Sequence, residues 1–286
     1  MNSEESAPID ESAMDYKSDT PLLGKYIATF LNNKEIASRE EDNRVLFYRG
    51  QSDITYSLTP SVFRKKELLD KEHNLIYDLL LSSPEEFDGI ENDLERLIKM
   101  QHYGLPTRLL DVTMNPLVAL FFACNKSKDV DGEIIVFYEY MQRSSDDNVR
   151  YLVALAEYSG STEHQMLGFL TDKGLTNTNF RKLIKTTYIP IKVPRNNERI
   201  RRQCGAFMVA GIHDNEEGNL FQKAVFDLKP LLVRDFEDGI FRSIIIPKET
   251  KSQLIKELDA LGINHAFLFP ELEHQTMYLR NKYEEV

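Results

Sequence analysis

Arg49 stands where an arginine can hold an anion. It follows residues 45–48, which are apolar and rich in strand-forming side chains, and it directly precedes Gly50. This pattern predicts a strand that ends at the arginine. The planar guanidinium binds carboxylate and phosphate oxygens in pairs, so the segment predicts an anion-binding arginine. An ordinary edge-strand arginine, paired with a surface carboxylate, is the alternative.

A second group of polar residues lies between an expected core strand and an expected core helix. Arg108, Asp111 and Thr113 crowd this junction, and Asn115 followed by Pro116 is typical of a helix start. Backbone donors and side chains often converge on a ligand at such a junction. A structural pair between Arg108 and Asp111, or a capping role for Asp111, is the alternative.

The third segment is the most basic part of an acidic chain. Four arginines lie between residues 195 and 202, just ahead of a strand that begins near Gly205. Such a positive patch suits an anionic ligand, although a solvated charged turn would also account for it. His102 precedes the second segment and is either a site residue or a structural histidine.

Composition excludes several classes of protein. The chain has 286 residues, of which 42% are hydrophobic. Its net charge of −11 argues against nonspecific binding to nucleic acid, which requires clustered Lys and Arg. No apolar run approaches the ~20 residues of a membrane helix, and the N-terminus does not resemble a signal peptide. We therefore expect a cytoplasmic protein without a membrane partner. The two cysteines and six histidines lack metal-ligand spacing, so no metal is expected.

Periodicity and turn signals predict the elements that must position these residues. We expect a disordered acidic tail at 1–20 and a single domain at 21–286, with 144–185 forming a helical insertion or flanking layer. Helices are predicted at 22–31, 67–81, 84–102, 116–125 and 251–261. Strands are predicted at 45–48, 109–110, 132–140, 205–209 and 241–246, with an edge or linker at 188–194 and a strand or turn at 262–270.

Several motifs together resemble the FRG domain family. They are Phe47-Tyr48-Arg49-Gly50-Gln51, the run from Gln101 to Asp111, Asn115-Pro116 with Ala119, Leu120, Phe122 and Ala123, and Arg199, Gln203, Gly205 and Phe207. The motifs cover about residues 46–209, and Phe269-Pro270-Glu271-Leu272 is similar to the usual C-terminal end of the family. This resemblance implies a fold more than an activity.

The same segments also resemble the Arg–Ser–Glu type of ADP-ribosyltransferase. Arg49-Gly50 matches its first motif, Asp111-Val112-Thr113 stands in place of Ser-Thr-Ser, and Glu198 lies near the position of its glutamate. The resemblance implies that Arg49 anchors the diphosphate of NAD, with Gly50, Gln51, His102, Thr107 and Arg108 also at the cofactor. It further implies that Thr113 orients the cofactor, that Glu198 or Asp111 stabilises the sugar cation, and that Gln203 positions the acceptor.

The sequence thus predicts an α+β fold with a split, mostly antiparallel sheet, flanking helices and an ADP-ribosyltransferase-like core. The resemblance to ADP-ribosyltransferases implies ADP-ribosyl transfer from NAD to a protein or nucleic-acid acceptor, and the settings in which such domains occur imply a bacterial toxin or antiphage role. A module that binds or senses a nucleotide or nucleic acid without chemistry is the alternative from another class. A purely structural interaction domain is the third.

Overall fold

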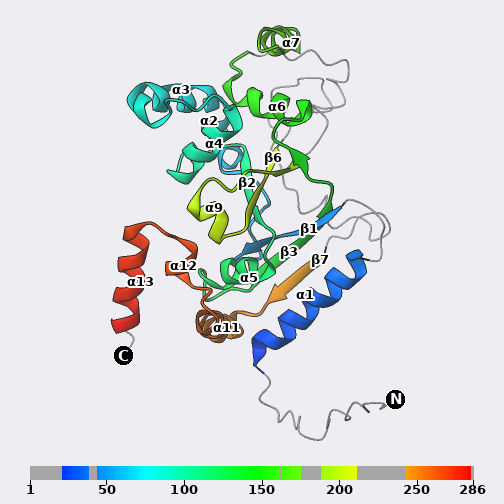
Figure 1. Ribbon diagram of the computed structural model, residues 1–286, viewed down its shortest axis with the longest axis vertical. Helices are drawn as coiled ribbons and strands as arrows, with labels where there is room; N and C mark the ends of the chain where they lie inside the picture. Colours follow the sequence, from blue (N-terminus) through cyan, green and yellow to red (C-terminus); the bar gives the residue numbers. More distant parts are fainter. Residues whose placement is uncertain (1–20, 39–43, 161–162, 175–187, 211–241, 285–286) are drawn as a thin grey trace, which may run out of the picture.

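The computed structural model describes residues 21–38, 44–160, 163–174, 188–210 and 242–284. The predicted disordered tail at 1–20 lies outside them. Figure 1 shows α2, α3, α4, α6 and α7 gathered at one end of the molecule. It shows α1, α5, α11, α12 and α13 at the other end, and the strands run between the two groups.

The elements have the following bounds. The α-helices are α1 (Leu22–Ser38), α2 (Lys66–Leu69), α3 (Glu72–Ser82), α4 (Asp93–His102), α5 (Pro116–Cys124), α6 (Asp147–Ala154), α7 (Glu163–Asp172), α9 (Glu198–Arg202), α11 (Lys248–Ala260), α12 (His265–Leu268) and α13 (Leu272–Glu284). Short 3₁₀ helices are η2 (Ser61–Arg64), η3 (Pro84–Glu86) and η4 (Leu155–Glu157). The strands are β1 (Val45–Gln51), β2 (Leu109–Thr113), β3 (Gly132–Glu139), β4 (Gln142–Arg143), β5 (Tyr188–Lys192), β6 (Gly205–Ala210) and β7 (Arg242–Ile246).

The strands of the described residues form one sheet in the order β4-β5-β6-β2-β1-β3-β7. Every neighbouring pair is antiparallel except β4 and β5. The predicted α+β class and mostly antiparallel sheet are therefore confirmed. The sheet is continuous, but only one residue pair, Tyr48 with Thr113, joins β1 to β2. The molecule thus has two half-sheets, β4-β5-β6-β2 and β1-β3-β7, that meet at one point.

Asparagine caps explain three places where the helices differ from the predicted pattern. The helix expected at 84–102 is divided, and α4 begins anew where the Asn92 side chain accepts from the main-chain nitrogens of Leu94 and Glu95. Asn197 caps α9 in the basic segment, and Asn264 caps α12, where a strand or turn was expected. A side-chain oxygen that satisfies free N–H groups allows these short helices to start in irregular chain.

Glycine and alanine allow α5 to lie directly on the β1-β3-β7 half-sheet. A Cβ atom on Gly50 would stand 1.8 Å from the carbonyl oxygen of Ala119, and one on Gly132 would stand 2.3 Å from that of Ala123. The glycine after Arg49 is therefore required by this close approach of helix to strand. This contact between β1 and α5 also holds the neighbouring residue, Arg49, at the gap between the half-sheets.

We predict that Gly50→Ala destabilises the protein by about 1–3 kcal/mol, because the added methyl group forces β1 and α5 apart. Urea unfolding followed by circular dichroism measures the effect. Gly168→Ala is the matched control, since nothing lies within 4 Å of its Cβ position and the residue is inside α7. There alanine should stabilise the protein by about 0.5–1 kcal/mol. Equal effects of the two changes would contradict the account of Gly50.

The region predicted as a helical insertion or flanking layer packs on the core in its described part. Val149 and Leu152 of α6 and Met166 and Leu170 of α7 are buried in one hydrophobic cluster with α4, β5 and β6. Residues 161–162 and 175–187 of this region lie outside the described chain. No helix in the described part of the chain is long and apolar enough to cross a bilayer.

Candidate functional site

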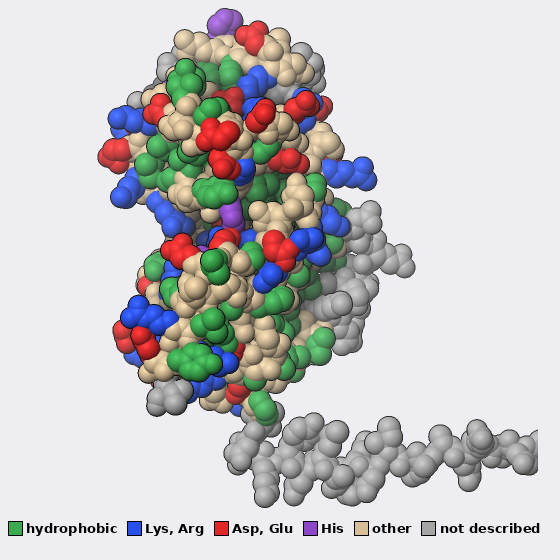
Figure 2. Space-filling view, turned by 60° about the vertical axis from the view of Figure 1, so that its left-hand side comes forward, with side chains coloured by type: hydrophobic (Ala, Val, Ile, Leu, Met, Phe, Trp, Pro, Cys, Tyr) green, Lys and Arg blue, Asp and Glu red, His purple; other side chains and the backbone are tan. Residues whose placement is uncertain are grey.

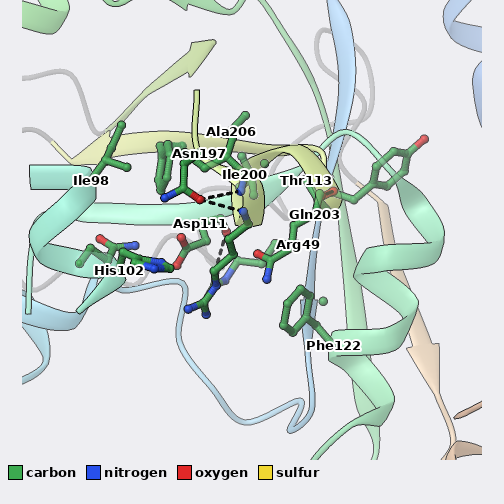
Figure 3. A pocket seen from close by; sticks show the side chains of 17 residues that line it. Arg49, Ile98, His102, Asp111, Thr113, Phe122, Asn197, Ile200, Gln203 and Ala206 are labelled. Carbon is green, nitrogen blue, oxygen red and sulfur yellow. Dashed lines mark hydrogen bonds between the residues drawn. The ribbon is translucent and has the colours of Figure 1, made fainter. Parts of the chain in front are cut away.

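A cavity of about 260 Å³ lies where β1 and β2 separate beyond their single shared pair (Figure 3). Its lining comes from β1, β2 and β6, from α4, α5 and α9, and from the chain around α9. The lining residues are Tyr48, Arg49, Gly50, Ile98, Gln101, His102, Asp111, Val112, Thr113, Phe122, Asn197, Arg199, Ile200, Gln203, Gly205, Ala206 and Phe207. The space-filling view shows the molecule hollowed between its upper and lower parts, with charged side chains of both signs around the hollow (Figure 2).

Asp111 is an exposed residue in the middle of an otherwise buried strand. Its four neighbours in β2 are buried, and β2 itself lies inside the sheet between β1 and β6. Because the side chain is exposed, water can solvate its charge without a partner from the protein. Within the described residues its carboxylate makes no hydrogen bond, and it lines the cavity instead. The fold therefore holds a free carboxylate on a rigid central strand.

Arg49 bridges the gap between the two half-sheets. Its Nη1 donates a hydrogen bond of 2.6 Å to the main-chain oxygen of Asp111, drawn as a dashed line in Figure 3. Its Nε is buried without a hydrogen-bond partner in the described chain. Burial lowers the pKa of Arg49 to about 10, while the charge of Asp111 raises it and that of Arg64 lowers it further. The guanidinium stays cationic at neutral pH, and a bound anion would offset the cost of its burial.

Main-chain and side-chain contacts fix α9 against β2. The Thr113 hydroxyl donates 2.6 Å to the main-chain oxygen of Gln203 and accepts from the nitrogen of Asn115 at 3.0 Å. The Gln203 side chain donates 3.1 Å to the main-chain oxygen of Leu268. The hydroxyl of Thr113 and the side-chain amide of Gln203 are therefore engaged in holding the cavity wall in place. Arg199 of α9 adds a second guanidinium to the cavity lining.

His102 is the last residue of α4 and faces an acidic partner from the C-terminal part of the chain. Its Nε2 lies 3.2 Å from Oε1 of Glu271. Burial lowers the pKa of His102, the charge of Arg199 lowers it further, and Glu271 opposes the shift. The lowered pKa favours the neutral imidazole, in which one ring nitrogen can accept a proton.

Four of the predicted site residues lie outside this lining. Arg108 is buried, with Nε 3.0 Å from Oε1 of Glu72 and further hydrogen bonds to the main-chain oxygens of Leu152 and Leu155. The guanidinium is thus fully engaged in the core, and it pairs with Glu72 instead of Asp111. The alternative pair with Asp111 is therefore not formed, and Arg108 lies outside the cavity lining.

The other three predicted site residues outside the cavity lining are Gln51, Thr107 and Glu198. The Gln51 side chain donates 3.3 Å to the main-chain oxygen of Ser57, and the Thr107 hydroxyl is hydrogen-bonded to the Gln101 side chain. Glu198 lies on the outer side of α9, where Arg202 Nε is 2.8 Å from its Oε1 and Arg201 also pairs with it. Hydrogen bonds from Arg202 and Arg201 lower the pKa of Glu198. The carboxylate that lines the cavity is Asp111.

The cavity also contains residues that sequence reasoning did not select as site residues. Gln101, Asn197, Arg199 and Phe122 line it, and Glu271 contacts it through His102. Gln101 and Arg199 belong to the motifs that resemble the FRG family, and this membership could have identified them as site residues. Glu271 belongs to the Phe-Pro-Glu-Leu run, which resembles the C-terminal end of the FRG family and was given no site role.

One protein family matches the part of the chain that contains β1, α4, β2 and α5. Residues 44–132 match the family model of the FRG domain. This segment of the chain is therefore similar to the FRG domain. The predicted FRG resemblance is thereby confirmed for this segment, which contains Arg49, His102, Asp111 and Thr113. Neither a curated protein nor a solved structure matches the chain. The lining residues of α9 and β6 follow the matched FRG segment.

Proposed function

We propose that the protein binds NAD in this cavity and transfers its ADP-ribosyl group to an acceptor. The observation that carries the proposal is the free carboxylate of Asp111 beside the partly buried cation of Arg49, both at the edge of the gap between the half-sheets. A cation binds the diphosphate, and a fixed carboxylate stabilises the positive charge that develops on the ribose. The order and spacing of the motifs, which resemble those of ADP-ribosyltransferases, agree with this proposal.

The residues of the cavity supply the parts that cleavage of the glycosidic bond requires. Nicotinamide leaves with the electron pair of the bond, and the ribose carbon becomes positively charged in the transition state. Such a reaction needs positioning and electrostatic stabilisation more than a covalent intermediate. Arg49 and Arg199 anchor the diphosphate, Asp111 faces the ribose cation, and the aromatic ring of Phe122 offers a surface for the nicotinamide.

The size of the cavity suits one end of the dinucleotide. Small-molecule sites typically have volumes of about 300–1,000 Å³. At about 260 Å³ the cavity holds a nicotinamide and its ribose, with the adenosine end extending outward. The acceptor would then approach from the same open side.

A second candidate is a module that binds a nucleotide without turning it over. The position of Glu198 favours it, because the expected catalytic glutamate is paired with Arg201 and Arg202 outside the cavity. If Asp111 does not act in its place, the two cavity arginines still form an anion site. Binding and cleavage must therefore be measured separately.

Incubation with NAD labelled in the adenylate phosphate and, separately, in the nicotinamide ring tests the proposal. We expect nicotinamide release and transfer of the phosphate label to protein or nucleic acid, with both lost in Arg49→Ala because the diphosphate anchor is removed. Calorimetry with NAD gives the affinity without turnover. Binding without nicotinamide release would favour the sensing module, and absence of both would favour an interaction domain. Arg150→Ala, an exposed arginine of α6 outside this cavity, is the matched control.

A further inference from the structure

A histidine and a glutamate from distant parts of the chain meet at the edge of the cavity. His102 ends α4, and Glu271 lies between α12 and α13. Besides the 3.2 Å contact with His102, Oε1 of Glu271 lies 3.9 Å from Nη1 of Arg199. Both carboxylate oxygens are buried, and neither makes a hydrogen bond within the described chain. Burying a carboxylate costs free energy unless it has a charged or hydrogen-bonding partner. The nearby His102 and Arg199 are the partners that can offset this cost.

The segment that carries Glu271 is held firmly on α9. Nε2 of Gln203 donates 3.1 Å to the oxygen of Leu268, and Nη1 of Arg202 donates 3.2 Å to that of Phe267. The Arg199 guanidinium lies 4.6 Å from the ring centre of Phe269. These contacts fix the loop from two sides. Glu271 therefore has a defined place relative to His102.

We propose that His102 is the general base of the site, which takes the proton of the acceptor, and that Glu271 positions its imidazole. This inference rests on the proposed ADP-ribosyl transfer and adds to it the residue that activates the acceptor. The acceptor class it implies is a neutral O–H group, either a hydroxyl or water, because such a nucleophile must lose a proton as it attacks. A neutral imidazole that lines the cavity can accept that proton.

The proposed step transfers the ribosyl group from nicotinamide to the acceptor oxygen. The acceptor oxygen forms a bond to the ribose carbon, and the bond from that carbon to the nicotinamide nitrogen breaks. The electron pair of the broken bond neutralises the nicotinamide ring, which leaves. The acceptor proton passes to Nδ1 of His102, because Nε2 faces Glu271. The resulting imidazolium is stabilised by the carboxylate of Glu271.

The pH profile of nicotinamide release by the full-length protein, with water as acceptor, tests the pair. His102→Gln is expected to lower kcat about 100-fold or more while the KM for NAD stays within threefold, and to remove the acid limb of the profile. Arg199 and Glu271 are the charged groups that act on His102 within the described residues. Glu271 raises the pKa of His102, so Glu271→Gln should move the acid limb to lower pH and reduce kcat.

Two controls and one independent measurement separate this inference from the proposed function. His164→Gln on α7 and Glu273→Gln on α13 change exposed residues and should leave the profile unchanged. In protein with ¹³C-labelled histidine, the His102 resonance should report a lowered pKa, which falls further in Glu271→Gln. If the wild type cleaves NAD and His102→Gln retains its rate and pH profile, the inference is overturned while the proposed function stands. If the wild type does not cleave NAD, both are overturned.

Discussion

Asp111→Asn is expected to reduce NAD cleavage about 100–1,000-fold while the affinity for NAD changes little. Asparagine has the shape of aspartate, so the cavity and the β2 pairing with β6 remain, and only the negative charge opposite the ribose is lost. The loss should therefore appear in kcat, because the interaction is made with the transition state. Nicotinamide release under saturating NAD measures kcat, and calorimetry measures affinity.

Glu198→Gln provides the decisive comparison for that result. The sequence places Glu198 near the catalytic glutamate of the similar transferases, but its side chain is 43% exposed and paired with two arginines. If Asp111 is the catalytic carboxylate, Glu198→Gln retains most of the activity. Asp129→Asn, an exposed aspartate outside the cavity, controls for the chemical change. Full activity in Asp111→Asn together with loss in Glu198→Gln would transfer the role to Glu198.

Glu72→Ala is expected to destabilise the protein by about 3–5 kcal/mol, because it leaves the buried charge of Arg108 without its carboxylate. The side chains of Arg108 and Glu72 are 3% and 6% exposed. Burial raises the pKa of Glu72, and the charge of Arg108 opposes the shift. The pair therefore contributes a fixed connection between α3 and the start of β2 more than a net gain in energy. Chemical unfolding at pH 7, followed by circular dichroism, measures the loss.

Glu67→Ala is the matched control for Glu72→Ala. Glu67 is exposed on the neighbouring helix α2, so its removal should change stability by no more than about 0.5 kcal/mol. Equal stability of the two variants would contradict the structural role given to the Arg108–Glu72 pair. The same pair also predicts that substitutions of Arg108 act on folding, with no direct effect on ligand contacts.

The elements with strong local signals were predicted well from the sequence. Residues 45–48 and 132–140 are rich in β-branched and aromatic side chains, and they form the paired strands β1 and β3. Asn115 with Pro116 correctly predicted the start of α5. The short helices α9 and α12 were missed, because each depends on one asparagine cap within a segment whose composition suggests a turn. Local patterns do not reveal such brief helices.

The site was predicted in part, for a physical reason. Arg49, Asp111 and Thr113 lie at strand positions, where alternation and register bring them to the same gap. Arg108 was assigned to the ligand because it lies at the same strand–helix junction as Asp111 and Thr113. Its actual partner, Glu72, lies 36 positions earlier, on a helix whose packing no local pattern specifies. Glu271 was missed for the same reason, since it reaches His102 from more than 160 positions away.

The cavity is assembled from residues within the matched segment 44–132 and residues that follow it. Arg49, Asp111 and His102 lie within residues 44–132, whereas Arg199, Gln203 and Glu271 come after them. Substitutions in α9 and in the chain that carries Glu271 would therefore reshape one wall of the cavity while Arg49 and Asp111 keep their places on β1 and β2.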